Sequence, residues 1–196
     1  MATTIQVSAE LKNQLEKRKI KKSKRPLLFA VIQGGTEIDL RKKCAQELVK
    51  IGFDGYSFGA RHVDQNSKFL TNILKKTAQF IPQDSPRFAL GVGTPEDIEK
   101  CVKLGWDMFD CVIPTREGRH GKLFVSNSKK KSININNSVF SKDFTIIKRD
   151  SKINGLKNHS RAYLKHLFQL KEPLGQKLAA LNNLEFYQKL LTDLRK

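Results

Sequence analysis

The sequence predicts an α/β fold equivalent to about half of a (β/α)8 TIM barrel, followed by a small β insertion and C-terminal helices. Four short apolar runs alternate with segments of helical periodicity, the pattern of right-handed βαβ units around a parallel sheet. A polar or glycine residue follows each run, at the strand end where such barrels carry their sites. A whole barrel takes about 250 residues, whereas this chain has 196 and the pattern stops after four units. A doubly wound sheet would give the same pattern and stays open as the competing architecture.

The individual elements follow from apolar runs and helical spacing. Leu27–Ile32 is a continuous apolar run, which indicates a strand buried on both faces. The helix after it ends at Gly52, the next stops near Pro82, and a third begins at Pro95, a favoured first helical position. The residues expected to face inward are Leu40, Cys44, Leu48 and Ile51 in the first helix and Phe69, Ile73 and Leu74 in the second. The later strands are expected at 55–59, 87–92 and 107–112.

The chain changes character after Pro114. Two β-prone segments with a polar turn between them indicate a small antiparallel insertion, and a capping serine and a proline indicate two further helices. In order, these are strands Lys122–Val125 and Lys131–Ile135 with the turn at Asn127 and Ser128, then helices from Ser160 to Leu170 and from Pro173 to the end. We divide the chain into a basic lead-in (1–25), a half-barrel (26–115) and a basic insertion with C-terminal helices (116–196).

Positive charge is concentrated in two parts of the chain. The formal net charge is +18, of which residues 1–25 carry +6 and residues 116–171 carry +11, whereas residues 26–115 are neutral. A lysine-rich composition alone would have raised the charge of the neutral part as well, so the distribution favours a nucleic-acid partner. The basic run 21–25 is expected to be solvated, after a possible helix over Ala9–Ile20.

Several other classes of protein are excluded. Hydrophobic residues make up 39% and charged residues 29%, which is ordinary for a globular protein. No apolar run is long enough for a transmembrane helix, and the first residues contain no signal-peptide core. The spacing of Cys44, Cys101 and Cys111 matches neither a disulfide framework nor a zinc motif. We expect a cytoplasmic protein without a membrane partner.

Five stretches together resemble the C-terminal half of bacterial-type tRNA-guanine transglycosylases, the enzymes of queuosine insertion. The stretches occur in the family's order and at the family's spacing, and five in order are far more specific than one. The resemblance implies the second half of a TIM barrel and a pentosyltransferase that exchanges guanine at the tRNA wobble position for a 7-deazaguanine base. The stretches are Phe29–Gly35, Ile51–Gly59, Pro86–Asp97, Gly105–Gly121 and Ser160–Leu167.

The resemblance also implies roles for particular residues. Asp110 matches the family's nucleophile, and a carboxylate at a strand end suits that role because it can trap an oxocarbenium-like ribose covalently. Without the resemblance, Asp110 suits a loop cap before Pro114 equally well. The residues that match the base pocket are Gln33, Gly59, Ala60 and Leu90, and those that match tRNA contacts are Val112, Arg116 and Arg119.

The ligands of the family's zinc site are missing from this sequence. The resemblance places Ser151, Ile153 and Leu156 at three cysteine positions and Asn182 at the histidine position. Isoleucine and leucine cannot bind zinc. We therefore expect no structural zinc and no other cofactor.

Two further departures concern the base pocket and the chemistry. Ala60 adds a methyl group where the family has the second glycine of a pair, and Gln65 stands where the family has a glutamate. The family's acid/base aspartate and its base-reading aspartate lie in the N-terminal half, which residues 1–25 replace here. Loss of an acid/base partner is expected to lower the rate by about 10²–10⁴-fold.

The function favoured by the sequence is base exchange at the wobble position of tRNA, with Asp110 holding the ribose. The expected partners are tRNA, a guanine or 7-deazaguanine base, and either an N-terminal-half partner or a second copy that covers the open half-barrel, whose strand edges would otherwise be exposed. The alternative is a non-catalytic tRNA-binding subunit or a decaying paralogue, which would form no covalent adduct. A third alternative is an enzyme that performs the same base exchange on DNA. A binding competition between tRNA and duplex DNA at a fixed salt concentration distinguishes the two substrates.

Overall fold

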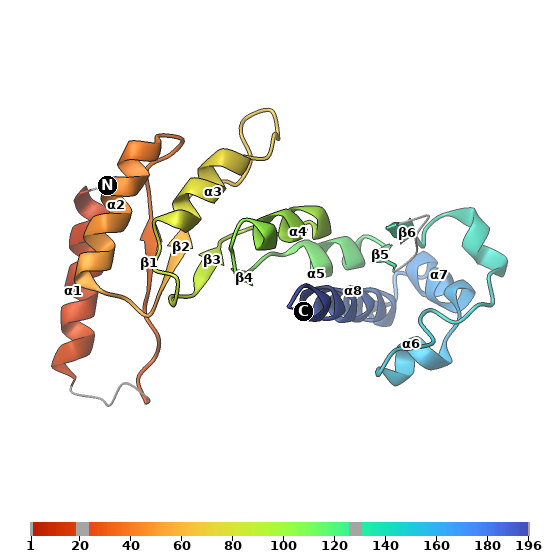
Figure 1. Ribbon diagram of the computed structural model, residues 1–196. Coiled ribbons are helices and arrows are strands. Elements are labelled where there is room, and N and C mark those ends of the chain that lie inside the picture. The colour runs from red at the N-terminus through yellow and green to blue at the C-terminus, as the bar shows by residue number, and fades with distance from the viewer. Residues whose placement is uncertain (1, 19–23, 126–130, 196) are drawn as a thin grey trace. The chain divides into compact units, whose positions relative to one another are not determined.

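The computed structural model describes residues 2–18, 24–125 and 131–195 (Figure 1). The chain divides into two compact units, Met1–Cys111 and Val112–Lys196, and each unit is described by itself. The polar turn expected at Asn127 and Ser128 lies outside the described residues. Within the described ranges, no helix combines the length and the apolar character that crossing a membrane requires.

Unit 1 contains a parallel sheet whose four strands lie side by side in chain order, which confirms the predicted α/β class. Right-handed crossovers in this order place the connecting helices on one face, as in a barrel, whereas a doubly wound sheet reverses its strand order. The observed order therefore favours barrel-type winding over the doubly wound alternative. The strands are β1 (Phe29–Ile32), β2 (Gly55–Phe58), β3 (Arg87–Ala89) and β4 (Met108–Phe109).

One face of this sheet forms the core of unit 1 with the connecting helices α2 (Ile38–Ile51), α3 (Thr71–Gln79) and α4 (Pro95–Lys103). The register partners Ile32, Phe58 and Ala89 are completely buried on this face. Trp106 lies edge-on to Phe58, with ring centroids 5.8 Å apart. Helix α4 begins at the expected Pro95, and the hydroxyl of Thr94 caps it by accepting from the amide of Asp97 at 3.1 Å.

The amino ends of the strands are tied together by two aspartates. Asp54, just before β2, accepts a hydrogen bond from the amide of Leu28 at 2.8 Å, and its own amide donates to the Leu28 carbonyl at 3.0 Å. Asp107, just before β4, makes the same pair of bonds with Arg87, at 2.8 and 2.9 Å. Each carboxylate thus extends the ladder by one bond and fixes the register at this edge of the sheet.

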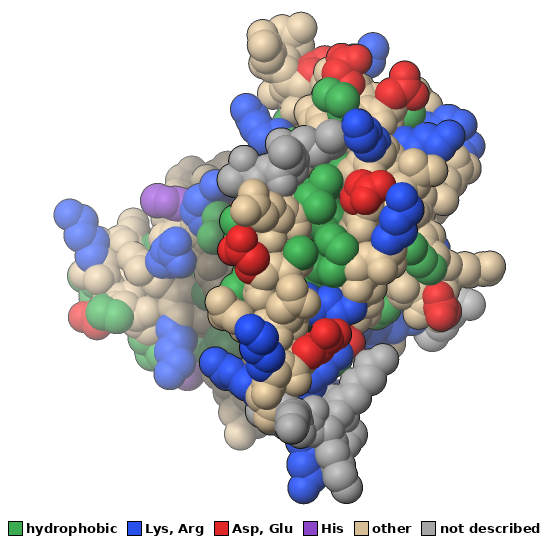
Figure 2. All heavy atoms as spheres, turned by 90° about the vertical axis from the view of Figure 1, so that its left-hand side faces the viewer, with side chains coloured by type: hydrophobic (Ala, Val, Ile, Leu, Met, Phe, Trp, Pro, Cys, Tyr) green, Lys and Arg blue, Asp and Glu red, His purple; other side chains and the backbone are tan. Residues whose placement is uncertain are grey.

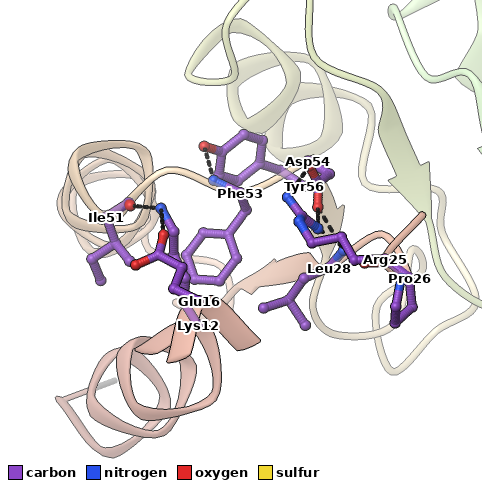
Figure 3. Close-up of polar contacts among 9 residues, drawn as sticks. All are labelled: Lys12, Glu16, Arg25, Pro26, Leu28, Ile51, Phe53, Asp54 and Tyr56. Atoms are coloured by element: carbon purple, nitrogen blue, oxygen red, sulfur yellow. Dashed lines mark hydrogen bonds and ion pairs between the residues drawn. The ribbon is translucent and has the colours of Figure 1, made fainter. Parts of the chain in front are cut away.

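The first helix, α1 (Ala2–Lys17), packs against α2, whereas the sequence analysis expected a solvated lead-in with a helix beginning only at Ala9. Figure 3 shows the contacts. The ammonium of Lys12 donates to the carbonyl of Ile51 at the end of α2, where the helix dipole favours a cation. Arg25 forms two hydrogen bonds with the Asp54 carboxylate, at 2.6 and 2.9 Å. The last residue of the basic run is therefore paired with an acid rather than solvated.

The face of the molecule drawn in Figure 2 mixes charges of both signs. Lysine and arginine side chains are interspersed with aspartate and glutamate, and hydrophobic side chains reach the surface between them. On α1, Val7 and Leu11 are about half exposed (48% and 50%). This mixture differs from the single-sign stripe expected of a polyanion-binding surface.

Unit 2 is a helical assembly around a small antiparallel hairpin. Its core is a cluster of buried aliphatic residues, among them Leu123, Ile135, Leu156, Leu164 and Leu178. The helices predicted from Ser160 and Pro173 are confirmed. Ser160 caps its helix by accepting from the amide of Tyr163 at 3.1 Å. The elements are α5 (Ile113–Arg119), β5 (Lys122–Phe124), β6 (Ser132–Asn134), the 3-10 helix η1 (Ser138–Lys142), α6 (Asn154–Asn158), α7 (Arg161–Gln169) and α8 (Pro173–Leu194).

Two buried asparagines of α8 hold α5 and β5 in place. The side-chain amide of Asn183 donates to the carbonyls of Pro114 and Lys122, both at 2.9 Å, and its oxygen accepts from the amide of Phe124 at 2.9 Å. Asn182 donates to the Phe124 carbonyl at 3.1 Å. The long helix thereby orients α5 through main-chain hydrogen bonds as well as through packing.

Candidate active site

Four predicted site residues form one row at the carboxyl edge of the sheet. Gln33, Gly59, Leu90 and Asp110 each directly follow one of the register partners Ile32, Phe58, Ala89 and Phe109. Successive side chains of a strand point to opposite faces of the sheet. The row of four candidates therefore faces away from the side that the helices cover. The structure thus brings the nucleophile candidate and three of the base-pocket candidates to the same edge and the same face.

Contacts within this row are close. A Cβ on Gly59 would lie 2.7 Å from the side-chain amide carbon of Gln33, so the glutamine amide rests directly against the glycine backbone. At the other end of the row, one carboxylate oxygen of Asp110 accepts a hydrogen bond from the amide of Gly91 at 2.9 Å. That bond joins the ends of β3 and β4 and fixes the direction of an exposed carboxylate.

Ala60 occupies a backbone conformation that favours glycine. Its φ is 120°, in a region that residues with a Cβ rarely adopt. The methyl group noted from the sequence therefore adds backbone strain at the edge of the base-pocket candidates. Gln65, the other departure in this segment, is exposed.

The loop that follows Ala60 is tied to α4. His62 Nε2 lies 3.5 Å from a carboxylate oxygen of Asp97, and its ring meets that of Phe69 with centroids 6.1 Å apart. Within the loop, the carboxylate of Asp64 accepts from the amides of Asn66 and Lys68, at 2.9 and 2.8 Å. The loop that contains Gln65 thus has a defined set of internal contacts.

Sequence reasoning missed Arg41, which supports the row from the helix side. Its side chain is buried (1% exposed) and donates to the carbonyls of Gly35 at 2.7 Å, Gly59 at 2.8 Å and Ile32 at 3.3 Å. The guanidinium also lies over the Phe58 ring, 4.1 Å from its centroid. Burial lowers the pKa of Arg41 to about 10.

A signal for Arg41 was present in the sequence. Arg41 lies three, four and seven residues before the buried Cys44, Ala45 and Leu48, so its position belongs to the inward stripe of α2. A cation on an inward stripe needs buried acceptors, and the carbonyls at the ends of β1 and β2 are those acceptors.

The three tRNA-contact candidates lie on α5 or at its N-cap, in unit 2. Val112 is the N-cap residue of this helix and is 60% exposed. Arg116 and Arg119 are exposed, and Arg116 Nε lies 3.5 Å from a carboxylate oxygen of Glu117. A Cβ on Gly118, between the two arginines, would lie 2.7 Å from the amide nitrogen of Ala180, so α5 is held tightly against α8 with both arginines directed outward.

The four zinc-ligand positions do not fit a zinc ion. Leu156 is completely buried in the aliphatic cluster, and Ile153 packs against that cluster. The hydroxyl of Ser151 lies 3.1 Å from a carboxylate oxygen of Glu185, and the amide of Asn182 donates to two oxygens, of Phe124 and Asn183. Among the described residues, no three histidine, cysteine or acidic side chains gather as a metal site would need.

The fold and the row together define a class: an α/β protein with parallel strands in barrel order and a carboxylate, an amide and a close-packed glycine at the ligand-binding edge. A family model described as queuine tRNA-ribosyltransferase matches residues 1–196, and the chain belongs to this family. The match includes the first 25 residues, which the sequence resemblance had left out.

Curated relatives support the assignment. A queuine tRNA-ribosyltransferase of Thermoanaerobacter pseudethanolicus is 40% identical over 91% of this chain and 47% of its own length. Those of Actinobacillus pleuropneumoniae serotype 3 and Blochmanniella pennsylvanica are 44% and 43% identical, each over 86% of this chain and over 43% and 45% of their own lengths. The chain thus spans about half the length of the curated relatives it matches, namely their C-terminal part.

Proposed function

We propose that this chain contributes the ribose-holding part of a tRNA-guanine transglycosylase, which replaces guanine at the wobble position of tRNA with a 7-deazaguanine base. The observation that carries the proposal is the row of Gln33, Gly59, Leu90 and Asp110 on one face of the carboxyl edge. Membership of the queuine tRNA-ribosyltransferase family supports the same reaction.

In this reaction Asp110 attacks the ribose C1′ as the guanine bond breaks, and the pair of electrons of that bond leaves with guanine. The hydrogen bond from the Gly91 amide holds the carboxylate in one orientation for the attack. Guanine takes up a proton at N9 as it leaves. The incoming base gives up its own N9 proton as it displaces the carboxylate from C1′ and restores it, so that the protons of the two halves balance. The Gln33 amide, pressed against Gly59, is positioned to hydrogen-bond the edge of a planar base.

The arginines of α5 are proposed to bind the tRNA strand next to the exchanged base. Arg116 and Arg119 are exposed on a helix that Asn183 and Gly118 fix against α8, so their direction is set while their charge is available to phosphates and bases. The segment that begins at Arg116 carries a net charge of +11, which strengthens attraction to any tRNA.

We further propose that a second polypeptide or a second copy of the chain completes the sheet. Strand β1 is at the edge of the sheet as far as the described residues go, and Phe29, Val31, Phe88 and Leu90 on the face opposite the helices are only partly buried. Such a face is stabilised by further strands or by association. Light scattering checks this proposal: a stable monomer of the isolated chain contradicts it.

The deciding experiment for the reaction is incorporation of radiolabelled guanine into unmodified tRNA with a GUN anticodon, comparing the wild type with Asp110→Asn. The amide cannot act as a nucleophile, so incorporation and the covalent tRNA adduct are expected to disappear while tRNA retention on a filter persists. If the wild type retains tRNA but forms no adduct, the chain is a tRNA-binding member of the family instead.

A further inference from the structure

The segment that would surround a zinc ion is organised by a glutamate that the sequence analysis did not single out. Glu185, on α8, accepts hydrogen bonds from the Lys152 amide at 2.8 Å and the Ser151 hydroxyl at 3.1 Å through one carboxylate oxygen. Its other oxygen pairs with the Lys148 ammonium at 2.8 Å. A single side chain thus contacts three residues of the 148–152 segment.

The rest of the 147–160 segment closes around this contact. The Ser151 hydroxyl accepts from the amide of Ile153 at 2.9 Å, and the Lys148 amide donates to the Leu156 carbonyl at 3.1 Å. Inside the closed segment, Leu156 is completely buried, and a Cβ on Gly155 would lie 2.7 Å from a methyl carbon of Leu178. Apolar packing therefore fills the space between the segment and α8.

The polar contacts are sheltered from water. The side chains of Lys148 and Glu185 are each only 18% exposed, and Ser151 is 4% exposed as a residue. Burial pushes the pKa of Glu185 upward, yet the bonds from Lys148, Lys152 and Ser151 outweigh it and hold that pKa below its usual value. Sheltered ion pairs of this kind contribute more than exposed ones, and removing one partner leaves the other charge unpaired in a largely buried place.

We propose that in unit 2 the Glu185–Lys148–Ser151 cluster, together with the buried Leu156, replaces the zinc ion of the family as the link between the 147–160 segment and α8. The unit therefore folds without metal. This inference concerns the stability of the chain and does not depend on the proposed base exchange, so the two can fail separately.

The first test measures metal directly. The full chain, produced in zinc-supplemented medium, is analysed for zinc by elemental mass spectrometry, and its unfolding midpoint is recorded with and without a chelator and with added zinc. We expect well below one zinc per chain and no shift of the midpoint. One zinc per chain, or a midpoint that falls with the chelator, overturns the proposal.

The second test removes the carboxylate. Glu185→Gln keeps the shape but not the charge, and Glu185→Ala removes every contact; the unfolding midpoint of Glu185→Ala is expected to fall by about 5 °C or more. The matched control is Asp150→Asn, which removes a 69% exposed carboxylate of the same segment that pairs with Lys189 at 3.7 Å. The control is expected to shift the midpoint by no more than about 2 °C.

Amide hydrogen exchange keeps the proposal testable if Glu185→Ala does not fold. Ser151→Ala removes the acceptor of the Ile153 amide, and Glu185→Gln leaves the Lys152 amide a neutral acceptor in place of a charged one, so these amides are expected to lose protection. Unchanged protection in both variants, with a midpoint like that of Asp150→Asn, contradicts a linking role for the cluster.

Discussion

In unit 1 the buried guanidinium of Arg41 is satisfied by main-chain carbonyls, whereas in unit 2 the carboxylate of Glu185 is satisfied mostly by side chains that precede it by more than thirty residues. Among the described residues, no carboxylate pairs with Arg41. Carbonyls at strand ends cannot move without moving the sheet, but a lysine and a serine can adjust. The comparison teaches that loss of Arg41 has to disturb the backbone of the candidate site, whereas loss of Glu185 loosens one segment.

The largest effect is expected for Arg41→Met. The substitution removes the Arg41 donor from three carbonyls, of which that of Ile32 keeps the amide of Gly59, and we expect a loss of about 3–5 kcal/mol in the free energy of unfolding. Trp106, the single tryptophan, lies against the Phe58 ring that Arg41 covers, so its fluorescence is expected to shift to the red in the variant.

The control for Arg41→Met is Lys42→Met, on the exposed side of the same helix. It removes the same charge without touching the carbonyls, and is expected to change the free energy of unfolding by less than about 0.5 kcal/mol. Equal effects of the two variants would mean that charge, and not the carbonyl contacts, matters at this helix.

A smaller effect is expected for Asn183→Leu in unit 2. Two carbonyls, the main-chain amide of Phe124 and the side-chain amide of Asn182 each lose a partner, at a cost of about 2–4 kcal/mol in the free energy of unfolding, measured by denaturant titration. Asn158→Leu, at an exposed position at the end of α6, serves as the comparison. Similar stabilities for the two variants would show that apolar packing alone holds α5 on α8.

The smallest effect, and one of opposite sign, is expected for Ala60→Gly. Glycine tolerates a φ of 120°, so the variant is expected to gain about 1 kcal/mol in the free energy of unfolding. Ser67→Gly, at the ordinary left-handed φ of 61°, provides the reference and is expected to gain less. A thermal melt of each variant measures the difference, and a destabilised Ala60→Gly would contradict strain at this position.

The candidate row could be predicted from the sequence because the ends of the apolar runs are enough to locate its residues. Gln33, Gly59 and Asp110 each follow such a run, and parallel strands bring their ends to one edge. The strand lengths were less predictable: Leu27 belongs to the first apolar run, yet it is 65% exposed and lies outside β1.

Arg41 and Glu185 could not be found in the same way, because their partners are set by tertiary structure. Arg41 reaches the carbonyl of Gly59, eighteen residues further on, and Glu185 reaches Ser151 and Lys148 far upstream. The sequence shows the charge of each residue and the inward position of Arg41, but acceptors on other strands and loops carry no local pattern.

The pairs that Asp54 and Asp107 form at the amino ends of the strands also have an evolutionary consequence. Because register is set at that end, mutations at the opposite edge do not slide one strand past another. Residues after β2, such as Ala60 and Gln65, can therefore be exchanged while the strands stay aligned. Natural variation in this family is expected to accumulate in those carboxyl-side loops and to spare the two aspartates.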